Sequence, residues 1–274
     1  MPIYKSTDNI AKINTTSAIF KGAEIVFGTA PPEYLFNIDF TSGGSYPGTG
    51  TNFYDLSNDY TGSIINTPTY DSITGSFTFN GTSQRMTIPH NSLMDYVGNT
   101  DIDLTLVAWA KNTNTSFNDS ELFQKGFDIE APPFDARSGG NYSMNRKNNV
   151  LNYFTSIAVG TTDGIDTTEN VFRVASNIWQ TGSWLNIVVN YHYNADNNQT
   201  TGSVYVNNVL QTLSPTDYFD GYATPNTSSF VIGSTLFPTN HWKGDIAVLQ
   251  GIKTNWTATE VNDYWNSTKS RFGL

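Results

Sequence analysis

Several aromatic side chains of this 274-residue chain stand near amide, carboxylate or guanidinium groups, the combination that sugar binding requires. A flat ring can cover the apolar face of a sugar, while polar neighbours form hydrogen bonds with its hydroxyl groups. The residues in such surroundings, all expected on loops, are Arg137, Asn141, Tyr142, Tyr218, Tyr222, Asn240 and Trp242. Aromatic residues of a β-rich chain more often pack in the core or cover a sheet edge. A binding role and a packing role therefore both stay open at each position.

The side chains that usually carry catalysis show no recognisable arrangement. His90, His192 and His241 are scattered, and none stands beside a serine in a nucleophile motif. The chain has no cysteine, which excludes thiol catalysis and a Cys-ligated zinc site. No Gly-Lys-Ser/Thr sequence follows an expected strand, so a phosphate-binding loop is not expected either. We therefore expect a protein without enzymatic activity.

Two groups of acidic residues could supply oxygen ligands to a metal ion. Asp163 and Asp166 lie in one loop, and Asp39 and Asp245 would meet if the first and last strands are neighbours. Each of these carboxylates is more simply explained as a solvated loop acid or a turn cap. The metal ligands therefore remain unknown.

Composition and charge restrict the fold class and the partners. Short apolar runs alternate with Asn, Thr, Ser and Gly, and 14 % of the residues are aromatic, which is typical of an all-β protein. The formal net charge is −10, with 14 Lys+Arg against 24 Asp+Glu, so nucleic acid and anionic membrane surfaces are disfavoured as partners. The sequence shows neither a signal peptide nor a run of about 18 apolar residues, so we expect synthesis in a cytoplasm and no membrane insertion.

Short strands separated by polar turns would have to position any site. They are expected over Leu35 to Phe40, Gly75 to Asn80, Gln84 to Ile88, Asp103 to Lys111, Trp184 to Tyr193, Ser203 to Val206, Val209 to Leu210, Phe230 to Gly233 and Gly244 to Ile252. So many strands are enough for a two-sheet antiparallel sandwich.

Local patterns predict how some of these strands pair and which sides they bury. Gly81-Thr82-Ser83 and Asn207-Asn208 are turn sequences, so each is expected to join its flanking strands into a hairpin. Period-two alternation over Asp103 to Lys111 predicts one buried side, and the strand over Trp184 to Tyr193 is expected to be central in its sheet.

One helix is expected, at the end of the chain. Thr257-Ala258-Thr259-Glu260 is a capping box, which marks a helix start. Val261, Tyr264, Trp265 and Thr268 follow at helical spacing. This stripe is expected to lie on the sandwich.

The order of these pieces resembles the concanavalin A-like jelly roll, in particular its laminin G-like and pentraxin-like branch. The matching pieces are Phe79-Asn80-Gly81-Thr82-Ser83, Leu104 to Trp109, Leu122-Phe123-Gln124-Lys125-Gly126, Trp184 to Val189, Tyr205-Val206-Asn207-Asn208, Gly244-Asp245-Ile246-Ala247 and the closing segment Trp256 to Leu274. The resemblance covers roughly residues 34 to 274 and implies a fold with a tendency to bind carbohydrate or protein. Fold alone does not fix function.

The resemblance also bears on catalysis and on metal binding. Some members of this superfamily cleave glucans with two carboxylates on one strand, but no glutamate of this chain has their Glu-x-Asp-x-x-Glu spacing. Many members hold a calcium ion, so the resemblance leaves calcium open as a cofactor without assigning its ligands.

The first 30 residues resemble a different group, the lysine-punctuated segments at the start of bacteriophage tail, neck and fibre proteins. An apolar-x-Lys unit recurs at Ile3-Tyr4-Lys5, Ile10-Ala11-Lys12 and Ile19-Phe20-Lys21, and Pro31-Pro32 ends the pattern. A segment this short does not bury enough apolar surface to fold alone. We therefore expect two parts, an anchor and oligomerisation segment over residues 1–30 and a laminin G-like domain over 31–274. The anchor residues would be Ile3, Ile10, Ile19, Ile25 and Val26. An extra hairpin at the sandwich edge is the alternative.

Together these features predict a bacteriophage virion protein, a tail, neck or fibre appendage or a capsid decoration, which displays a lectin-like domain for host-surface glycans. It would be made in the host cytoplasm, bind other virion proteins through its N-terminal segment and form a homo-oligomer, with a trimer favoured. The alternatives are a cement protein that stabilises the particle and recognises nothing, and a cellular polysaccharide-binding module.

Overall fold

The chain divides into two compact units in a computed structural model, Met1–Glu33 and Tyr34–Leu274. The structure describes residues 10–13, 18–21, 24–27, 32–96, 100–115, 120–126, 142–147, 150–158, 167–174, 177–197, 199–213, 227–235 and 240–274.

The described residues of the N-terminal unit form a three-stranded antiparallel sheet in the order β1-β2-β3. Its strands are β1 (Ile10–Ile13), β2 (Ala18–Lys21) and β3 (Glu24–Phe27). The register pairs Lys12 with Ile19 and Ile19 with Val26, so backbone pairing places Ile10, Ile19 and Val26 on one side of the sheet. Ile25 lies on the other side, and Ile3 lies outside the described residues.

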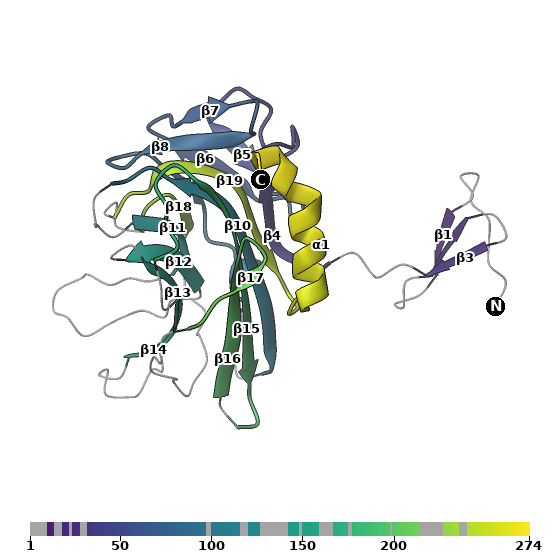
Figure 1. Cartoon of the computed structure of the whole chain (residues 1–274). Helices are drawn as coiled ribbons and strands as arrows, with labels where there is room; N and C mark the ends of the chain where they lie inside the picture. The colour runs from purple at the N-terminus through teal and green to yellow at the C-terminus, as the bar shows by residue number, and fades with distance from the viewer. Residues whose placement is uncertain are drawn as a thin grey trace. The chain divides into compact units, whose positions relative to one another are not determined.

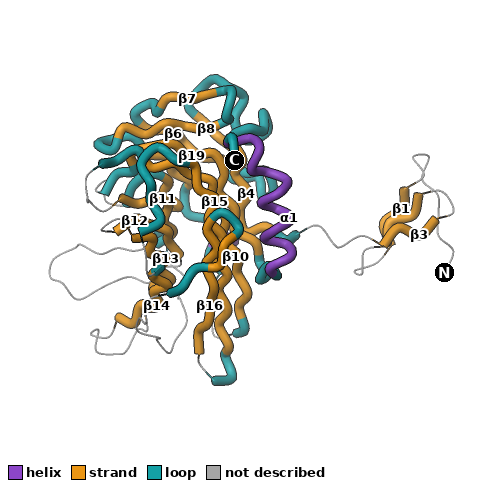
Figure 2. Tube along the Cα trace, in the orientation of Figure 1, coloured by secondary structure: helices purple, strands orange, loops and turns teal. Residues whose placement is uncertain are grey.

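The described residues of the larger unit form a sandwich of two antiparallel sheets (Figures 1 and 2), each with eight strands. The first sheet has the order β17 (Val209–Leu210), β16 (Gln199–Val206), β15 (Trp184–Asn194), β10 (Ile102–Asn112), β19 (Lys243–Ile252), β8 (Ser76–Asn80) and β7 (Thr69–Asp71), with β4 (Tyr34–Asp39) also paired to β19. The second has the order β14 (Thr167–Arg173), β13 (Val150–Ala158), β12 (Tyr142–Lys147), β11 (Ser120–Lys125), β18 (Phe230–Ile232), β9 (Arg85–Ile88), β6 (Thr61–Ile65) and β5 (Asn52–Tyr54). The helical elements are the 3-10 helix η1 (Ser92–Met94), the α-helix α1 (Ala258–Thr268) and the 3-10 helix η2 (Lys269–Phe272). The predicted two-sheet antiparallel sandwich with one C-terminal helix is confirmed.

The main core fills the space between the two sheets. Phe36 of the first sheet is fully buried, and its ring centroid lies 6.1 Å from that of Phe123, 5.8 Å from that of Tyr142 and 4.9 Å from that of Phe230, all in the second sheet. Such aromatic pairs stabilise a core beyond the apolar area they bury.

Helix α1 adds a third layer on the outer side of the first sheet (Figure 2). It begins with the predicted capping box, in which Thr257 Oγ1 accepts from the Glu260 backbone N–H and the Glu260 side chain accepts from the Thr257 N–H. Val261 then packs against Val107 and Val188 of the sheet. The predicted helix and its position on the sandwich are therefore confirmed.

This third layer corrects the expectation that β10 buries only one side. Trp109 lies on the outer side of the strand, yet it is 0 % exposed. Its ring stacks on Trp265 of α1 and on Phe272 of η2, with centroids 5.5 and 4.1 Å apart. Alternation shows which positions share a side, but a distant helix decides whether the second side is covered.

Of the two predicted hairpins, one is confirmed and one is wrong. Asn207 and Asn208 join β16 to β17 with φ of 49° and 66°, the left-handed values that this tight turn needs. Residues Gly81-Thr82-Ser83 do form a turn, but β8 before it pairs with β19 in the first sheet, whereas β9 after it pairs with β6 and β18 in the second. The turn therefore crosses between the sheets.

Candidate functional site

Two of the predicted sugar-binding rings belong to the core. Tyr142 and Trp242 are both 0 % exposed. The Tyr142 ring stacks on Phe36, its hydroxyl donates to the Met94 carbonyl at 3.3 Å, and burial raises the pKa of this phenol. Trp242 packs edge-on against Trp179 at 5.2 Å. The structure therefore corrects the expectation that these two rings face a ligand from a loop.

The other predicted site residues are separated from one another or lie outside the described part of the chain. Asn240 is exposed, with a φ of 48°, and its carbonyl accepts the Glu121 backbone N–H at 2.8 Å. Arg137, Asn141, Tyr218 and Tyr222 lie outside the described residues, as do Asp163 and Asp166.

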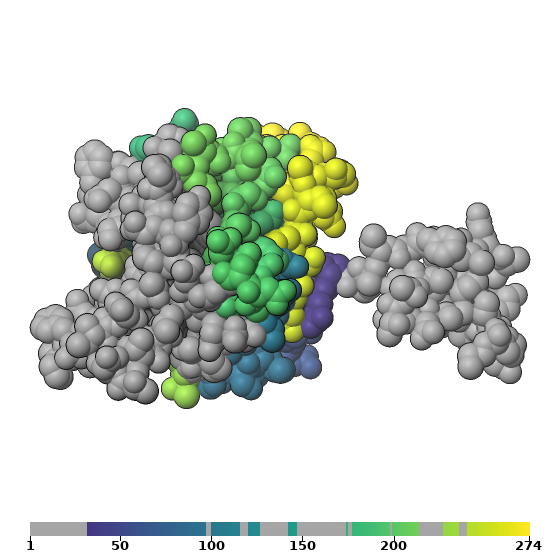
Figure 3. Space-filling view, turned by 90° about the horizontal axis from the view of Figure 1, so that it is seen from below, coloured from purple at the N-terminus to yellow at the C-terminus, as the bar shows by residue number. Residues whose placement is uncertain are grey.

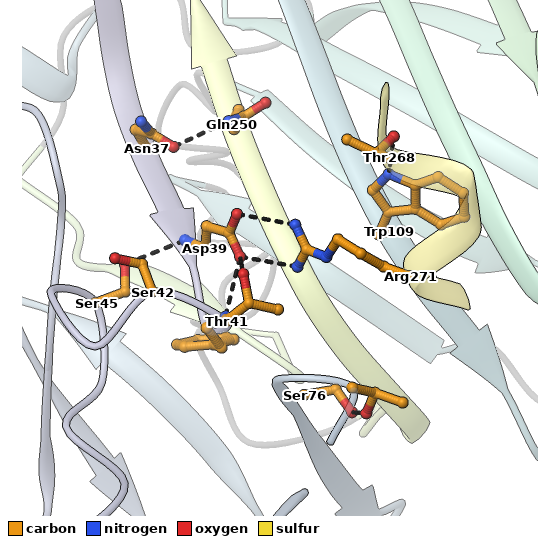
Figure 4. A network of polar contacts seen from close by, with 12 residues as sticks. Asn37, Asp39, Thr41, Ser42, Ser45, Ser76, Trp109, Gln250, Thr268 and Arg271 are labelled. Carbon is orange, nitrogen blue, oxygen red and sulfur yellow. Dashed lines mark hydrogen bonds and ion pairs between the residues drawn. The ribbon is translucent and has the colours of Figure 1, made fainter. Parts of the chain in front are cut away.

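Asp39 and Asp245, which could supply oxygen ligands to a metal ion, have other partners. Asp39 accepts hydrogen bonds from Nη1 and Nη2 of Arg271, at 3.1 and 3.0 Å (Figure 4). Asp245 forms an ion pair with Lys111. Among the described residues no group of three or more His, Asp or Glu could hold a metal ion.

The polar network in Figure 4 has a structural explanation. Asp39 Oδ1 also accepts the Thr41 hydroxyl at 2.6 Å, while the Trp109 indole N–H donates to Thr268 at 3.2 Å. These bonds fasten the C-terminal helices to β4 and β10. Both Asp39 oxygens and the Trp109 N–H already have internal partners, so the network is a poor candidate for ligand binding.

A better candidate lies on the outer side of the first sheet, near the start of α1. Backbone register places Asp103, His192 and Thr201 side by side in one row across β10, β15 and β16. The next row contains Thr105, Asn190 and Ser203, and Tyr205 follows on β16. Asn255 and Trp256 precede α1 and are hydrogen-bonded to both rows. We call this surface the outer polar face and define it by Asp103, Thr105, Asn190, His192, Thr201, Ser203, Tyr205, Asn255 and Trp256.

Figure 3 shows this end of the molecule, where the green surface of β15 and β16 lies beside the yellow surface of the C-terminal segment. Thr201 is exposed, and Ser203, Tyr205 and Trp256 are half-buried. Trp256 packs on Tyr264 with centroids 5.1 Å apart, and Tyr205 packs against the Val107 and Val261 cluster. The two rings are thus fixed in place while part of each stays accessible.

Buried hydrogen bonds hold the second row rigid. Asn190 Oδ1 accepts the Thr105 hydroxyl at 2.8 Å, and Asn190 Nδ2 donates to the Trp256 carbonyl at 2.8 Å and to Ser203 Oγ at 3.3 Å. The Trp256 N–H in turn donates to Thr105 Oγ1 at 3.0 Å. A satisfied buried network of this kind fixes the positions of the groups above it.

The first row carries polar atoms that remain open to solvent. Asp103 Oδ1 lies 2.8 Å from His192 Nδ1 and accepts the Asn255 amide N–H at 2.8 Å. Asp103 Oδ2, His192 Nε2 and the Thr201 hydroxyl have no partner among the described residues, and the Asp103 side chain is 51 % exposed. Carboxylate, imidazole and hydroxyl groups on the same face of the sheet as an aromatic ring match the hydrogen-bonding and stacking needs of a sugar.

The row Asp103, His192, Thr201 also has the order of an acid, a base and a hydroxyl nucleophile. A catalytic arrangement needs a hydrogen bond between base and nucleophile, and none joins His192 to Thr201 in the described structure. Asp103 shares Oδ1 between His192 and an amide. The geometry therefore supports ligand contacts better than acyl transfer.

Sequence reasoning missed this face although part of its signal was present. Alternation already places Asp103 and Thr105 on the outer side of one strand, and Asn190 and His192 on the outer side of another. That these strands are neighbours, in this register, depends on pairing across 73 or more residues.

Comparison with known proteins supports the fold. No protein-family model matches the chain, and no curated protein sequence matches it. The binding domain of botulinum neurotoxin serotype G is similar in structure, with a TM-score of 0.57 and 12 % identity, over 86 % of this chain and 51 % of that one. The receptor-binding domain of botulinum neurotoxin mosaic serotype C/D matches with a TM-score of 0.54 and 12 % identity, over 86 % and 51 %. The fold is a jelly-roll sandwich.

At these identities the likeness concerns the fold alone. The chain spans about half the length of the two toxin structures. Among the described residues no helix is long and apolar enough to cross a membrane.

Proposed function

We propose that the chain is a non-enzymatic adhesion protein of a bacteriophage virion, whose jelly-roll domain binds glycans of the host surface through the outer polar face. The observation that carries this proposal is the row of open polar atoms on Asp103, His192 and Thr201, on the same face of the sheet as the half-buried Tyr205. The two toxin structures, which are named as a binding and a receptor-binding domain, support the use of this fold in recognition.

The ligand should be neutral in charge. The chain carries a formal charge of −10, and Asp103 adds a half-exposed carboxylate in the first row of the face. An acidic sugar would meet repulsion there, whereas the hydroxyl groups of a neutral sugar can donate to Asp103 Oδ2. A glycan array probed with the full chain should therefore give binding to neutral glycans. Silence across a broad array would favour a cement protein that stabilises the particle.

The placement on a virion rests on the N-terminal segment. Its apolar-x-Lys units resemble the start of phage tail, neck and fibre proteins, and its strands form a unit of their own. Attachment of many copies to one particle would make weak sugar contacts effective through avidity.

Deletion of residues 1–30 should abolish incorporation into particles, because the attachment surface is removed while the sandwich begins only at Tyr34. Mass spectrometry of purified particles would measure the incorporation, with the full chain as control. Equal amounts of both proteins in the particles would contradict the attachment role and favour a cellular polysaccharide-binding module.

A further inference from the structure

The polar surface of the first sheet continues along β16 beyond the row of His192 and Thr201. Backbone register pairs Gln199 with Asn194 in the next row, towards the start of the strand. Alternate residues of a strand point to the same side of its sheet. The outward residues of β16, which we call the β16 stripe, are Gln199, Thr201, Ser203 and Tyr205.

The burial pattern of β16 agrees with this assignment. The side chains of the stripe belong to exposed or half-buried residues, whereas the inward residues Thr200, Val204 and Val206 are buried. Along the strand the stripe therefore presents an amide, two hydroxyl groups and an aromatic ring. These are the groups that form hydrogen bonds with sugar hydroxyls and cover the apolar face of a sugar.

The segment before α1 covers the second row on two of its three strands. Asn190 Nδ2 donates to the Trp256 carbonyl at 2.8 Å, and the Trp256 N–H donates to Thr105 Oγ1 at 3.0 Å. Thr105 and Asn190 are accordingly only 0 % and 8 % exposed. Beyond this row α1 itself packs on β10 and β15. A ligand that extends past the first row must therefore follow β16.

The row at the other end of the stripe combines a fixed backbone with open amide groups. Asn194 Oδ1 accepts the backbone N–H groups of Asp196 and Asn197 at 3.0 and 3.2 Å, and the Gln199 N–H donates to Asn197 Oδ1 at 3.1 Å. The Gln199 side-chain amide and Asn194 Nδ2 have no hydrogen-bond partner in the part of the chain that the structure describes. They can therefore bind the hydroxyl groups of a ligand.

We propose that the outer polar face binds a linear neutral oligosaccharide that lies along the β16 stripe, with Gln199 as a further binding residue. The inference rests on the proposed function and adds the length and the direction of the ligand. At ordinary strand geometry Gln199 and Tyr205 are about 20 Å apart, too far for contact with one sugar ring. A chain of linked sugars carries hydroxyl groups along its whole length and can contact both. Its affinity should therefore rise with the number of linked sugars.

Titration calorimetry of the full chain tests this binding mode with fragments of the neutral glycan identified on the array, from the single sugar to chains of increasing length. The wild-type protein should bind longer fragments more tightly. Gln199→Ala removes the amide at one end of the stripe and should weaken binding of the longest fragment by about three- to tenfold, the usual net contribution of one hydrogen bond. The shortest fragment that binds, held near the Tyr205 ring, should keep its wild-type affinity.

Gln180→Ala is the matched control. Gln180 is also an exposed glutamine, but it precedes Trp184 at the opposite end of β15 and lies outside the stripe. This variant should bind every fragment like the wild type.

Three results would overturn the extended binding mode: equal affinity for all fragments, no loss for the longest fragment in Gln199→Ala, or the same loss for every fragment in that variant. These results are separable from failure of the proposed function. Silence of the wild-type protein across the array refutes sugar binding and the extended mode together. Binding on the array with any of the three results refutes the extended mode alone.

Discussion

Replacing Asp95 by alanine should lower the free energy of unfolding by about 3–5 kcal/mol at neutral pH, the usual cost of breaking a buried ion pair. Asp95 Oδ1 lies 2.8 Å from Lys125 Nζ, and the two side chains are 6 % and 0 % exposed. Lys125 is held on the core side of β11, where it pairs in register with Tyr142 and Phe230. Without Asp95 its ammonium group would remain buried without its carboxylate. Urea unfolding followed by tryptophan fluorescence measures the loss.

The cost of this substitution should shrink as the pH rises. Burial lowers the pKa of Lys125, while Asp95 opposes that shift, so Asp95→Ala should lower the pKa further. A lysine whose pKa is lower in the folded protein holds its proton less tightly there than in the unfolded chain. As the pH rises from the lowered pKa to the ordinary value of 10.5, the unfolded chain binds the lysine proton more fully than the folded protein does. The free energy of unfolding therefore increases over this range.

An exposed contact of an aspartate offers the control. His192 and Asp103 are also 2.8 Å apart, but their side chains are 36 % and 51 % exposed, so Asp103→Ala should cost no more than about 1 kcal/mol. Adding Lys125→Met to Asp95→Ala should recover much of the loss. Equal costs for the two aspartate variants would contradict the account of a buried pair.

Trp109→Ala should destabilise the domain by about 3–5 kcal/mol and release the C-terminal helix from the sheet. The Trp109 ring is 0 % exposed and is stacked on Trp265 and Phe272, and its N–H donates to Thr268. Its removal leaves a cavity beneath both C-terminal helices. Limited proteolysis should then cut near residues 253–274 in the variant before the rest of the sandwich is degraded.

Trp184→Ala is the matched control for the helix. Trp184 is also on the outer side of the first sheet and contacts Phe272 at 4.7 Å, but it is half-buried. It should cost less stability and leave α1 resistant to protease. A Trp109 variant whose C-terminal segment is cut no faster than that of the wild type would show that the helix is held by other contacts.

Local sequence patterns predicted the elements better than their partners. The capping box at Thr257 and the turn at Asn207-Asn208 were confirmed because their geometry is decided within a few residues. The turn after Asn80 was predicted to join a hairpin. Its local hydrogen bonds are the same whether the next strand pairs with β8 or crosses to the other sheet. Asn80 Oδ1 accepts the N–H groups of Thr82 and Ser83, but pairing of β8 with β19, more than 160 residues away, takes the strand into the other sheet.

The site was harder to predict because exposure depends on the assembled layers. In the sequence, Tyr142 and Trp242 stand near polar residues, as ligand-binding aromatic residues do. In the structure, both rings are enclosed by core neighbours. The outer polar face was missed for another reason, because its residues lie far apart in the sequence. Its rows come from three strands and from the segment before α1, so no short window of the sequence contains them.

The central claim is that the outer polar face binds sugar, and the affinity of two threonine variants for a neutral glycan identified on the array tests it most directly. Thr201 and Thr69 are both exposed threonines on the outer side of the first sheet, but only Thr201 belongs to the face. Titration calorimetry should show binding at least about tenfold weaker for Thr201→Arg, a loss of about 1.4 kcal/mol, because the arginine covers the row. Thr69→Arg should bind like the wild type. Unchanged affinity in Thr201→Arg, with the glycan still bound, would contradict the claim.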